Sequence, residues 1–179
     1  MEYWDIYDRQ RIKKNKTVAK GIAREQLAAD DDYIMIVHAC IFNSRGQMLI
    51  QQRQPFKEGW SNLWDVSAGG RAIAGDTSQM AAERELFEEL GIKIDLQQAR
   101  PVFTINFEVG FDDFYVINRD LSLDQLVLQE TEVKDVKWAT QSEILELINK
   151  KLFIPYRNTF INFLFEYKDG STNGAIKTK

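Results

Sequence analysis

The sequence is poor in the residues that would mark it as anything other than an ordinary globular protein. It has one cysteine in 179 residues, so no internal disulfide can form, and this is typical of a reducing compartment. Prolines number 3 and glycines 10, too few for a low-complexity chain. The net charge is −4, whereas nucleic acids are bound by basic faces. These features predict a folded protein without a nucleic-acid partner.

Long apolar segments are also missing. The longest nearly apolar run, Tyr33 to Phe42, is about half the length needed to span a bilayer. The first residues, MEYWDIYDR, lack the basic and apolar regions of a signal peptide. The sequence therefore predicts a soluble, cytoplasmic protein without a membrane partner. Its 44% of hydrophobic residues is enough for a substantial core.

The apolar pattern predicts a mixed sheet with a few helices, of the α/β (α+β) class. A basic turn at residues 9–16 and a loop at 55–64 would join some of these elements, and Thr140 and Glu143 are placed as a capping box. The expected strands cover 2–7, 33–42, 47–53, 103–109, 114–118 and 133–138, and the expected helices lie between Thr77 and Gly91 and at 141–150 and 154–168.

No internal repeat or linker argues for a second full domain. We expect an N-terminal strand and hairpin extension at 1–29, a main domain at 30–150, and a C-terminal helix with a flexible tail at 151–179. The last helix is aromatic and would pack on its own core or on a second subunit, so a monomer and a homodimer are both open. The aromatic and apolar residues in question are Phe160, Phe163, Leu164 and Tyr167.

The chemical signal lies in the segment GGRAIAGDTSQMAAERELFEELGI, residues 69–92. Asp76 and Thr77 are candidate N-terminal caps, and Gly91 is placed to end the helix. Between them, three glutamates fall at i, i+3 and i+4 and so share an arc of roughly 100°. Apolar residues lie mostly on the other side and are expected to be buried. The glutamates are Glu85, Glu88 and Glu89, and the apolar residues are Met80, Leu86, Phe87 and Leu90.

Three clustered carboxylates repel one another, at about 0.2–0.5 kcal/mol for each exposed like-charged pair. A solvated acidic face would normally include lysines four residues away, and the only basic residue here is Arg84. A hard divalent cation would relieve the repulsion, and ligands made only of oxygen point to Mg²⁺ or Mn²⁺. The spacing alone leaves an acidic surface and a metal site about equally open.

The same segment resembles the Nudix box, which reads G, five residues, E, seven residues, then R-E-aliphatic-x-E-E-x-G-aliphatic. Gly70, Arg84-Glu85-Leu86, Glu88-Glu89 and Gly91-Ile92 match this pattern in eight of its nine defined positions. The departure is Asp76, which stands where the pattern has glutamate and shortens the side chain by one methylene. We expect this change to alter local geometry more than catalysis.

This resemblance implies an α/β/α sandwich with a mixed central sheet and a metal site on the helix. Glu85, Glu88 and Glu89 would hold Mg²⁺ with the Gly70 carbonyl, and Arg84 would pin the glutamates by an ion pair. The expected reaction is hydrolysis of a diphosphate linkage in a small molecule of the nucleoside diphosphate-X type. Asp76 would support the site.

Several acids are candidates for the general base in such a reaction. The first choice is Glu85, and an acid from a distant loop is the alternative. Glu132 in LQETEV is one candidate, although a solvated loop glutamate is commoner, and Asp112 and Asp113 are weaker candidates of the same kind.

Over about residues 2–140 the chain is similar to the Nudix branch that includes isopentenyl-diphosphate isomerase. That enzyme needs a cysteine and a metal-binding histidine before the box, and Gly69 and Arg71 occupy those positions here. The single cysteine, Cys40, and the single histidine, His38, are expected to be structural parts of one buried strand. Isomerase activity is therefore not expected.

The spacing of two basic loop residues resembles that of residues that bind the diphosphate in the isomerase. Arg53 and Lys57 are therefore candidate substrate-binding residues, with solvated loop charges as the alternative. Trp60 and Trp64 would wall a substrate pocket or, somewhat preferably, anchor the loop in the core. The basic residues Arg11, Lys13, Lys14 and Lys16 are interpreted as a solvated turn.

A binding domain without turnover is a third possible function. Such a domain usually loses the carboxylates of the R-E-x-x-E-E core of the box, and this chain keeps all of them. The box indicates how phosphates are handled and leaves the substrate's identity open.

Overall fold

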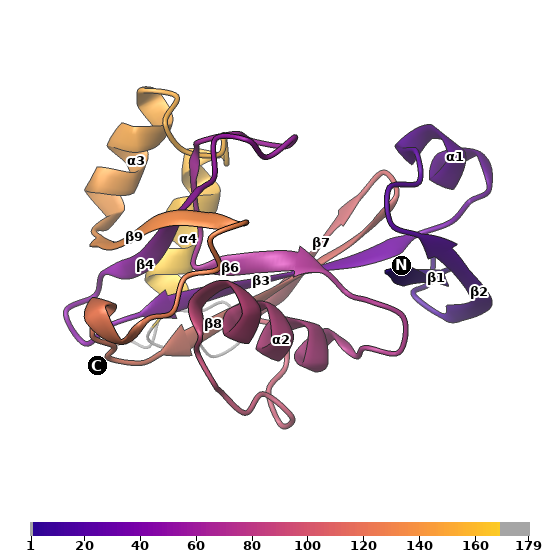
Figure 1. Ribbon diagram of the computed structural model, residues 1–179, viewed down its shortest axis with the longest axis horizontal. Helices are drawn as coiled ribbons and strands as arrows, with labels where there is room; N and C mark the ends of the chain where they lie inside the picture. Colours follow the sequence, from indigo (N-terminus) through magenta and orange to yellow (C-terminus); the bar gives the residue numbers. More distant parts are fainter. Residues whose placement is uncertain (1, 169–179) are drawn as a thin grey trace. The chain divides into compact units, whose positions relative to one another are not determined.

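The computed structural model describes residues 2–168 (Figure 1). These residues form two compact units that interleave along the chain. The first unit contains residues 1–39, 69–88 and 92–115, and the second contains 40–68, 89–91 and 116–179. Strands β3 (Ile34–Phe42) and β8 (Gly110–Asn118) pass from one unit into the other.

The first unit begins with a hairpin in which β1 (Tyr3–Tyr7) pairs antiparallel with β2 (Lys13–Ala19). The short helix α1 (Arg24–Ala29) follows. The early part of β3 pairs with β8 and with β6 (Ala68–Arg71), and β7 (Phe103–Phe107) pairs antiparallel with β8. Helix α2 (Ser78–Leu90) follows β6 and carries the glutamates of interest.

The second unit is built on β4 (Met48–Arg53), which meets the end of β3 at the pair Met48–Phe42. Strand β4 also pairs antiparallel with β5 (Trp64–Asp65) and with β9 (Val133–Ala139). The 3₁₀ turn η1 (Leu123–Gln125) precedes β9. Helices α3 (Gln141–Asn149) and α4 (Asn158–Tyr167) complete the unit. The predicted α/β (α+β) class, with a mixed sheet and few helices, is confirmed.

Each unit has buried apolar residues of its own. In the first unit, residues from β1, β2, α1, β3 and the turn between β7 and β8 form one cluster: Trp4, Ile6, Val18, Leu27, Ile34 and Val109. In the second unit, Leu164 of α4 is fully buried and Phe165 packs edge-on against Phe42 at 5.0 Å between ring centres. Helix α4 thus buries one face within its own chain, while Phe163 is 39% exposed.

The capping box predicted for α3 is confirmed. The Thr140 side chain accepts a hydrogen bond from the Glu143 backbone N–H, and the Glu143 carboxylate accepts one from the Thr140 backbone N–H. Residues 169–179, predicted as a flexible tail, lie outside the described residues. Among residues 2–168, no helix is long and apolar enough to cross a membrane.

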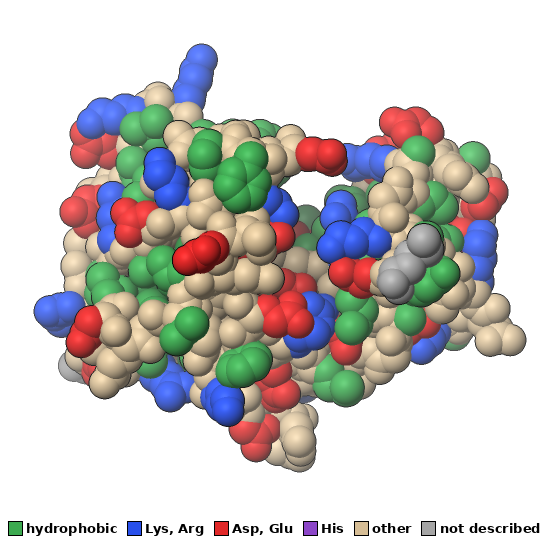
Figure 2. Space-filling model, viewed as in Figure 1, with side chains coloured by type: hydrophobic (Ala, Val, Ile, Leu, Met, Phe, Trp, Pro, Cys, Tyr) green, Lys and Arg blue, Asp and Glu red, His purple; other side chains and the backbone are tan. Residues whose placement is uncertain are grey.

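The prediction of a solvated basic turn at residues 9–16 is wrong in its second half. Lys13 begins β2, and each of the basic residues pairs with an acid: Lys13 with Asp5 at 2.5 Å, and Lys14 with Asp32 at 2.8 Å. Arg11 pairs with Asp113. These acids are distant in sequence, so the local pattern of lysines could not reveal the strand. Figure 2 shows the resulting mixture of basic and acidic side chains on one face.

Other elements also differ from the prediction, and β5 and β6 were not predicted as strands. Helix α1 was not predicted, because its six residues carry only one buried side chain, Leu27. The strand expected at 103–109 ends at Phe107, and the next strand begins at Gly110, four residues before the predicted start at Phe114. The C-terminal helix begins at Asn158. Its predicted start at Ile154 is wrong, since the N-cap is Arg157, whose backbone is extended with φ −65° and ψ 138°.

Asp32 provides a prediction about stability and pH. Its side chain is 2% exposed and pairs with Lys14 and Lys16. Burial raises the pKa of Asp32, but the two lysines outweigh burial and bring the pKa below its ordinary value. A lowered folded-state pKa means that the pair stabilises the fold above the unfolded carboxyl pKa and that this contribution disappears as the pH falls through the folded pKa.

Asp32→Asn is therefore expected to lower the free energy of unfolding by about 1–3 kcal/mol at pH 7. The difference from wild type should stay constant above about pH 5 and narrow as the pH falls below the unfolded carboxyl pKa of about 4. Urea unfolding at several pH values measures the loss of unfolding free energy and its dependence on pH. Asp30→Asn is the control, because Asp30 pairs with the same Lys16 at an exposed position and should change stability by less than about 0.5 kcal/mol. A loss for Asp32→Asn that does not change with pH would contradict this account.

Candidate functional site

Helix α2 has the caps that the sequence predicts. The Thr77 hydroxyl accepts a hydrogen bond from the Met80 backbone N–H at 3.2 Å, and Gly91 ends the helix with a φ of +70°. Leu86 and Leu90 are fully buried, as expected. The expected burial of Met80 and Phe87 is wrong, since these side chains are 49% and 50% exposed. The buried stripe of the helix is narrower than its apolar composition indicates.

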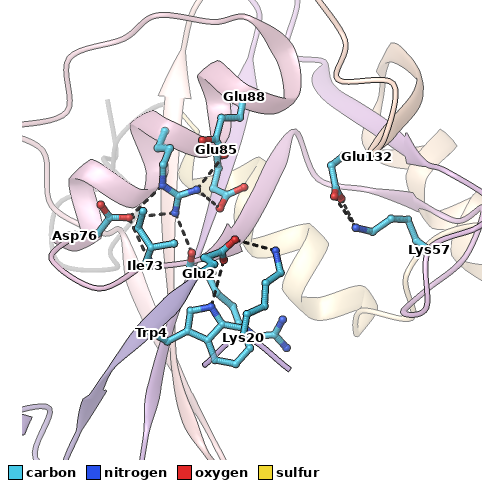
Figure 3. A network of polar contacts seen from close by, with 11 residues as sticks. Glu2, Trp4, Lys20, Lys57, Ile73, Asp76, Glu85, Glu88 and Glu132 are labelled. Atoms are coloured by element: carbon cyan, nitrogen blue, oxygen red, sulfur yellow. Dashed lines mark hydrogen bonds and ion pairs between the residues drawn. The ribbon is translucent and has the colours of Figure 1, made fainter. Parts of the chain in front are cut away.

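The Arg84 guanidinium lies at the centre of the acidic residues of α2 and the loop before it (Figure 3). It donates to Glu85 at 2.8 Å, to Glu88 at 3.1 Å, and through Nε to Asp76 at 3.2 Å. A further donor reaches the Arg71 carbonyl at 2.9 Å, which ties the helix to the end of β6. The predicted ion pair of Arg84 with the glutamates is present, and Asp76 joins it.

The electrostatics of this cluster depend on partial burial. The Arg84 side chain is 21% exposed and those of Asp76 and Glu85 are 10% and 13% exposed. Burial works to lower the pKa of Arg84, but Glu85 and Asp76 outweigh it and raise the pKa above its ordinary value. Arg84 therefore remains a cation at any pH at which the protein is folded, and it offsets part of the repulsion among the acids.

Gly70 lies directly against the Glu85 carboxyl group. A Cβ atom at position 70 would overlap that carboxyl group, so the space is available only because the residue is glycine. The neighbouring Gly69 is in the same situation, because a Cβ there would overlap the His38 ring. The two glycines allow β6 to pass close to His38 and to Glu85.

Glu89 is the most buried of the three helix glutamates, at 4% exposure. Its carboxylate accepts a hydrogen bond of 2.9 Å from the Gln51 side chain on β4, 38 residues away. A buried carboxylate is costly unless it is hydrogen-bonded, and Gln51 supplies one such bond. No local pattern singles out Gln51, because this contact is long-range and its neighbour Gln52 has the same chemistry.

The second unit contains the other predicted site residues. Lys57 donates to Glu132 at 2.6 Å, and the two side chains are 27% and 30% exposed. Glu132 is thus paired with a cation that was itself a candidate. Arg53 donates through Nε to the Gly59 carbonyl at 3.1 Å, within the same loop. Trp60 is 54% exposed, which does not fit a core anchor, while Trp64 lies in β5 with the Lys137 amine 4.6 Å from its ring centre.

The remaining candidate acids have structural partners. Asp113 is fully buried and accepts hydrogen bonds from Arg11, from Thr104 and from Ser78. Asp112 lies 2.6 Å from Nδ1 of His38, whose ring stacks on Phe114. Cys40 is fully buried, in keeping with the packing role predicted for it.

The N-terminal hairpin contributes residues that the sequence did not single out. The Glu2 carboxylate accepts from the Lys20 amine at 2.9 Å and from the Trp4 indole N–H at 3.4 Å. Burial raises the pKa of Glu2, but Lys20, Trp4 and more weakly Arg84 outweigh burial and lower it. The influence of Arg84 means that the end of the hairpin lies within electrostatic range of the α2 cluster.

Within residues 2–168, acidic, histidine and cysteine side chains do not converge in a ready-made group of three that would hold a metal ion. The reason lies in the contacts above. Arg84 binds Glu85 and Glu88, and Gln51 binds Glu89, so each of the three carboxylates already has a partner. A metal ion would have to compete with these contacts.

Comparison with known proteins identifies the family. The NUDIX domain matches residues 32–160, and the chain therefore belongs to the Nudix family. It is 47% identical to an uncharacterised Nudix hydrolase of Listeria innocua over 172 residues, covering 96% of this chain and 98% of the relative. It is also 36% identical over 73 residues to an isopentenyl-diphosphate Δ-isomerase of Pectobacterium atrosepticum, covering 41% of this chain and 39% of that enzyme.

Solved structures agree in fold. A protein of Deinococcus radiodurans is similar with a TM-score of 0.72 and 22% identity, over 91% of this chain and 97% of that one. A bifunctional NMN adenylyltransferase and ADP-ribose pyrophosphatase of Francisella tularensis, solved with AMP and a manganese ion, has a TM-score of 0.60 and 22% identity over 76% of this chain and 42% of that one. The resemblance to the Nudix hydrolases, with some similarity to the isomerases, is confirmed.

Proposed function

We propose that the protein hydrolyses a diphosphate linkage in a small molecule of the nucleoside diphosphate-X type, with Mg²⁺ or Mn²⁺ as its cofactor. The observation that carries this proposal is the arrangement around Arg84. One guanidinium holds Asp76, Glu85 and Glu88 together, although these carboxylates repel one another. Acids gathered in this way, partly buried and around a single cation, are typical of functional sites.

The donor set is suited to a hard divalent cation. Glu85, Glu88 and Glu89 lie at i, i+3 and i+4 of the unbroken helix α2 and offer only carboxylate oxygens. We assign the Gly70 carbonyl as a further oxygen ligand, because β6 approaches Glu85 at this glycine. Nudix hydrolases typically use divalent cations, and the Francisella protein was solved with manganese.

A bound divalent ion would supply charge neutralisation of the diphosphate and a site that orients the attacking water. The protein's own residues would position the metal ligands and bind the substrate. Arg84 positions Glu85 and Glu88, and Gln51 positions Glu89. Arg53 and Lys57 are the residues we assign to the substrate's phosphates, and Glu132 holds the Lys57 amine in place.

The general base must accept a proton from the attacking water within hydrogen-bond distance. We assign this role to Glu85, because its carboxyl group lies between Arg84 and the backbone of Gly70. Glu132 is the alternative, and its ion pair with Lys57 would first have to open.

Two other functions are alternatives. A domain that binds nucleotides or a protein partner without turnover is favoured only by Asp76, and Asp76 nevertheless contacts Arg84. Isopentenyl-diphosphate isomerase activity is disfavoured, because Gly69 and Arg71 replace the needed cysteine and histidine. A side chain at position 69 would also overlap His38. We further propose that the protein acts in the cytoplasm on a small molecule, as a monomer or homodimer.

A turnover screen over a panel of diphosphate compounds, with the phosphate or phosphomonoester products separated by chromatography, tests the proposal. The panel should include nucleoside diphosphates, nucleotide sugars, dinucleotides, thiamine diphosphate and prenyl diphosphates, each with Mg²⁺ and with Mn²⁺. We expect turnover of at least one class by the wild type. Glu89→Gln should lower that turnover by at least about a hundredfold, because it removes one charged ligand.

Gln51→Leu is a useful companion variant, since it removes the hydrogen bond that positions Glu89 and should raise the metal concentration needed for activity. A sample stripped of metal should be inactive. Wild-type turnover in both the stripped sample and Glu89→Gln would contradict a metal hydrolase. No turnover by the wild type on any class, with metal bound, would favour the binding domain.

A further inference from the structure

Arg71, the last residue of β6, has a side chain that the described fold does not pair. Its guanidinium carbon lies 4.7 Å from the centre of the Trp4 ring. Within residues 2–168 this side chain makes no hydrogen bond or ion pair, and it is exposed to solvent. A guanidinium has five N–H donors, so Arg71 presents an unused set of donors at the surface.

Trp4 holds this cation in a defined place. The indole is 4% exposed and belongs to the apolar cluster of the first unit, so the ring is fixed by its packing. Its N–H is directed to Glu2. A guanidinium stacked on an aromatic face keeps its N–H edges open for a ligand in the plane of the group. Arg71 therefore loses little conformational freedom when it binds an anion.

Arg71 lies next to the candidate metal site. The Arg71 carbonyl accepts a hydrogen bond from Arg84 at 2.9 Å, and the preceding residue, Gly70, lies against Glu85. Glu2, which binds Lys20 and Trp4 (Figure 3), lies within electrostatic range of Arg84, because Arg84 contributes to lowering the pKa of Glu2. A cation at this position can reach a ligand bound at Glu85.

The chemistry of position 71 also points to an anion. Arginine cannot ligate a metal ion because it stays protonated, and it binds phosphate with two parallel N–H donors. Lys20 and Glu2 form an ion pair of 2.9 Å, and Glu2 also interacts with Arg71, so the three groups together carry a net charge of +1.

From these observations we infer that Arg71, stacked on Trp4 and flanked by Lys20, forms an anion subsite for a phosphate group of the substrate. The inference rests on the proposed function, since the phosphate is that of the diphosphate substrate. Arg71 thereby makes the N-terminal hairpin part of substrate recognition. A purely structural contact between Arg71 and Trp4 would instead affect only the stability of the hairpin.

Binding of methylenediphosphonate, a diphosphate analogue that is not hydrolysed, separates these two roles. Calorimetric titration of the full chain in Mg²⁺ should give a Kd at least about tenfold weaker for Arg71→Met than for wild type. Arg71→Lys should lie between them, because it keeps the charge and loses the two parallel donors. Arg24→Met is the matched control. Arg24 lies 6.0 Å from the Phe107 ring in the same unit, and its loss should leave the Kd unchanged.

Thermal unfolding of each variant checks that the fold is intact, and Arg71→Lys keeps the test available if Arg71→Met does not fold. An unchanged Kd in Arg71→Met or Arg71→Lys, beside a wild type that binds the analogue, would overturn the subsite and leave the proposed function standing. A wild type that neither binds the analogue at millimolar concentration nor hydrolyses any diphosphate would contradict both.

Discussion

Glu85→Gln is expected to lower the kcat of diphosphate hydrolysis by about a hundredfold to ten-thousandfold, the largest effect of any single substitution. The amide keeps the size of the side chain and removes its charge and its basicity. It thereby removes both a metal ligand and the assigned general base. The hydrogen bond with Arg84 can persist through the amide oxygen, so thermal stability should change little.

Steady-state kinetics over a range of Mg²⁺ concentrations measures this effect. Glu83→Gln is the matched control on the same helix, because its amide oxygen can still accept the hydrogen bond from the Leu96 backbone N–H. We expect Glu83→Gln to keep at least about half of the wild-type activity. Equal losses in the two variants would mean that the net charge of the helix, and not the position of Glu85, determines activity.

Arg84→Lys is expected to lower kcat by about tenfold to a hundredfold, the second largest effect. Arg84 makes simultaneous contacts with Asp76, Glu85, Glu88 and the Arg71 carbonyl. A lysine ammonium is a single point charge and cannot span four acceptors in a fork. Glu85 and Glu88 would lose their common anchor, and the metal ligands would become less well positioned.

Metal binding distinguishes positioning from simple charge balance in this variant. If Arg84 positions the glutamates, Arg84→Lys should require a higher Mg²⁺ concentration for half-maximal activity, and saturating Mg²⁺ should restore part of kcat. At a given concentration, Mg²⁺ should also stabilise the variant in thermal unfolding less than it stabilises the wild type, because the variant binds the ion more weakly. Wild-type kcat and Mg²⁺ dependence in Arg84→Lys would rule out a positioning role.

Asp76 shows how a departure from the family pattern is accommodated. The pattern has glutamate here, and the shorter aspartate still accepts hydrogen bonds from Arg84 Nε and from the Ile73 backbone N–H. The chain before α2 therefore brings the carboxylate near enough for the shorter side chain. The expectation of altered local geometry agrees with these contacts, and its effect on activity stays a prediction.

The sequence predicted the local parts of the site and missed the long-range ones. The limits of α2 and the Arg84 ion pairs follow from residues within one helix and its preceding loop, where spacing determines geometry. Gln51 with Glu89 and Lys57 with Glu132 join residues 38 and 75 positions apart. Such contacts depend on strand pairing, which periodicity does not specify.

The elements of the fold divide in the same way, into those that a local pattern predicts and those that depend on long-range contacts. The strand that contains Val37 and Ile41 was predicted because its apolar residues are consecutive, and both are fully buried. Strand β2 was missed because Lys14 and Lys16 read as a solvated turn. Their charges are compensated by Asp32, which is buried in the first unit. Tertiary ion pairs here outweigh the low strand propensity of lysine.

The most direct test of the central claim is to locate Mn²⁺ by anomalous scattering in crystals grown with methylenediphosphonate. The account predicts a peak about 2.0–2.3 Å from carboxylate oxygens of Glu85 and at least one of Glu88 and Glu89, with the diphosphonate bound to the same ion. A peak at a different group of residues, or none in crystals of protein that hydrolyses diphosphates, would contradict a metal centre on α2.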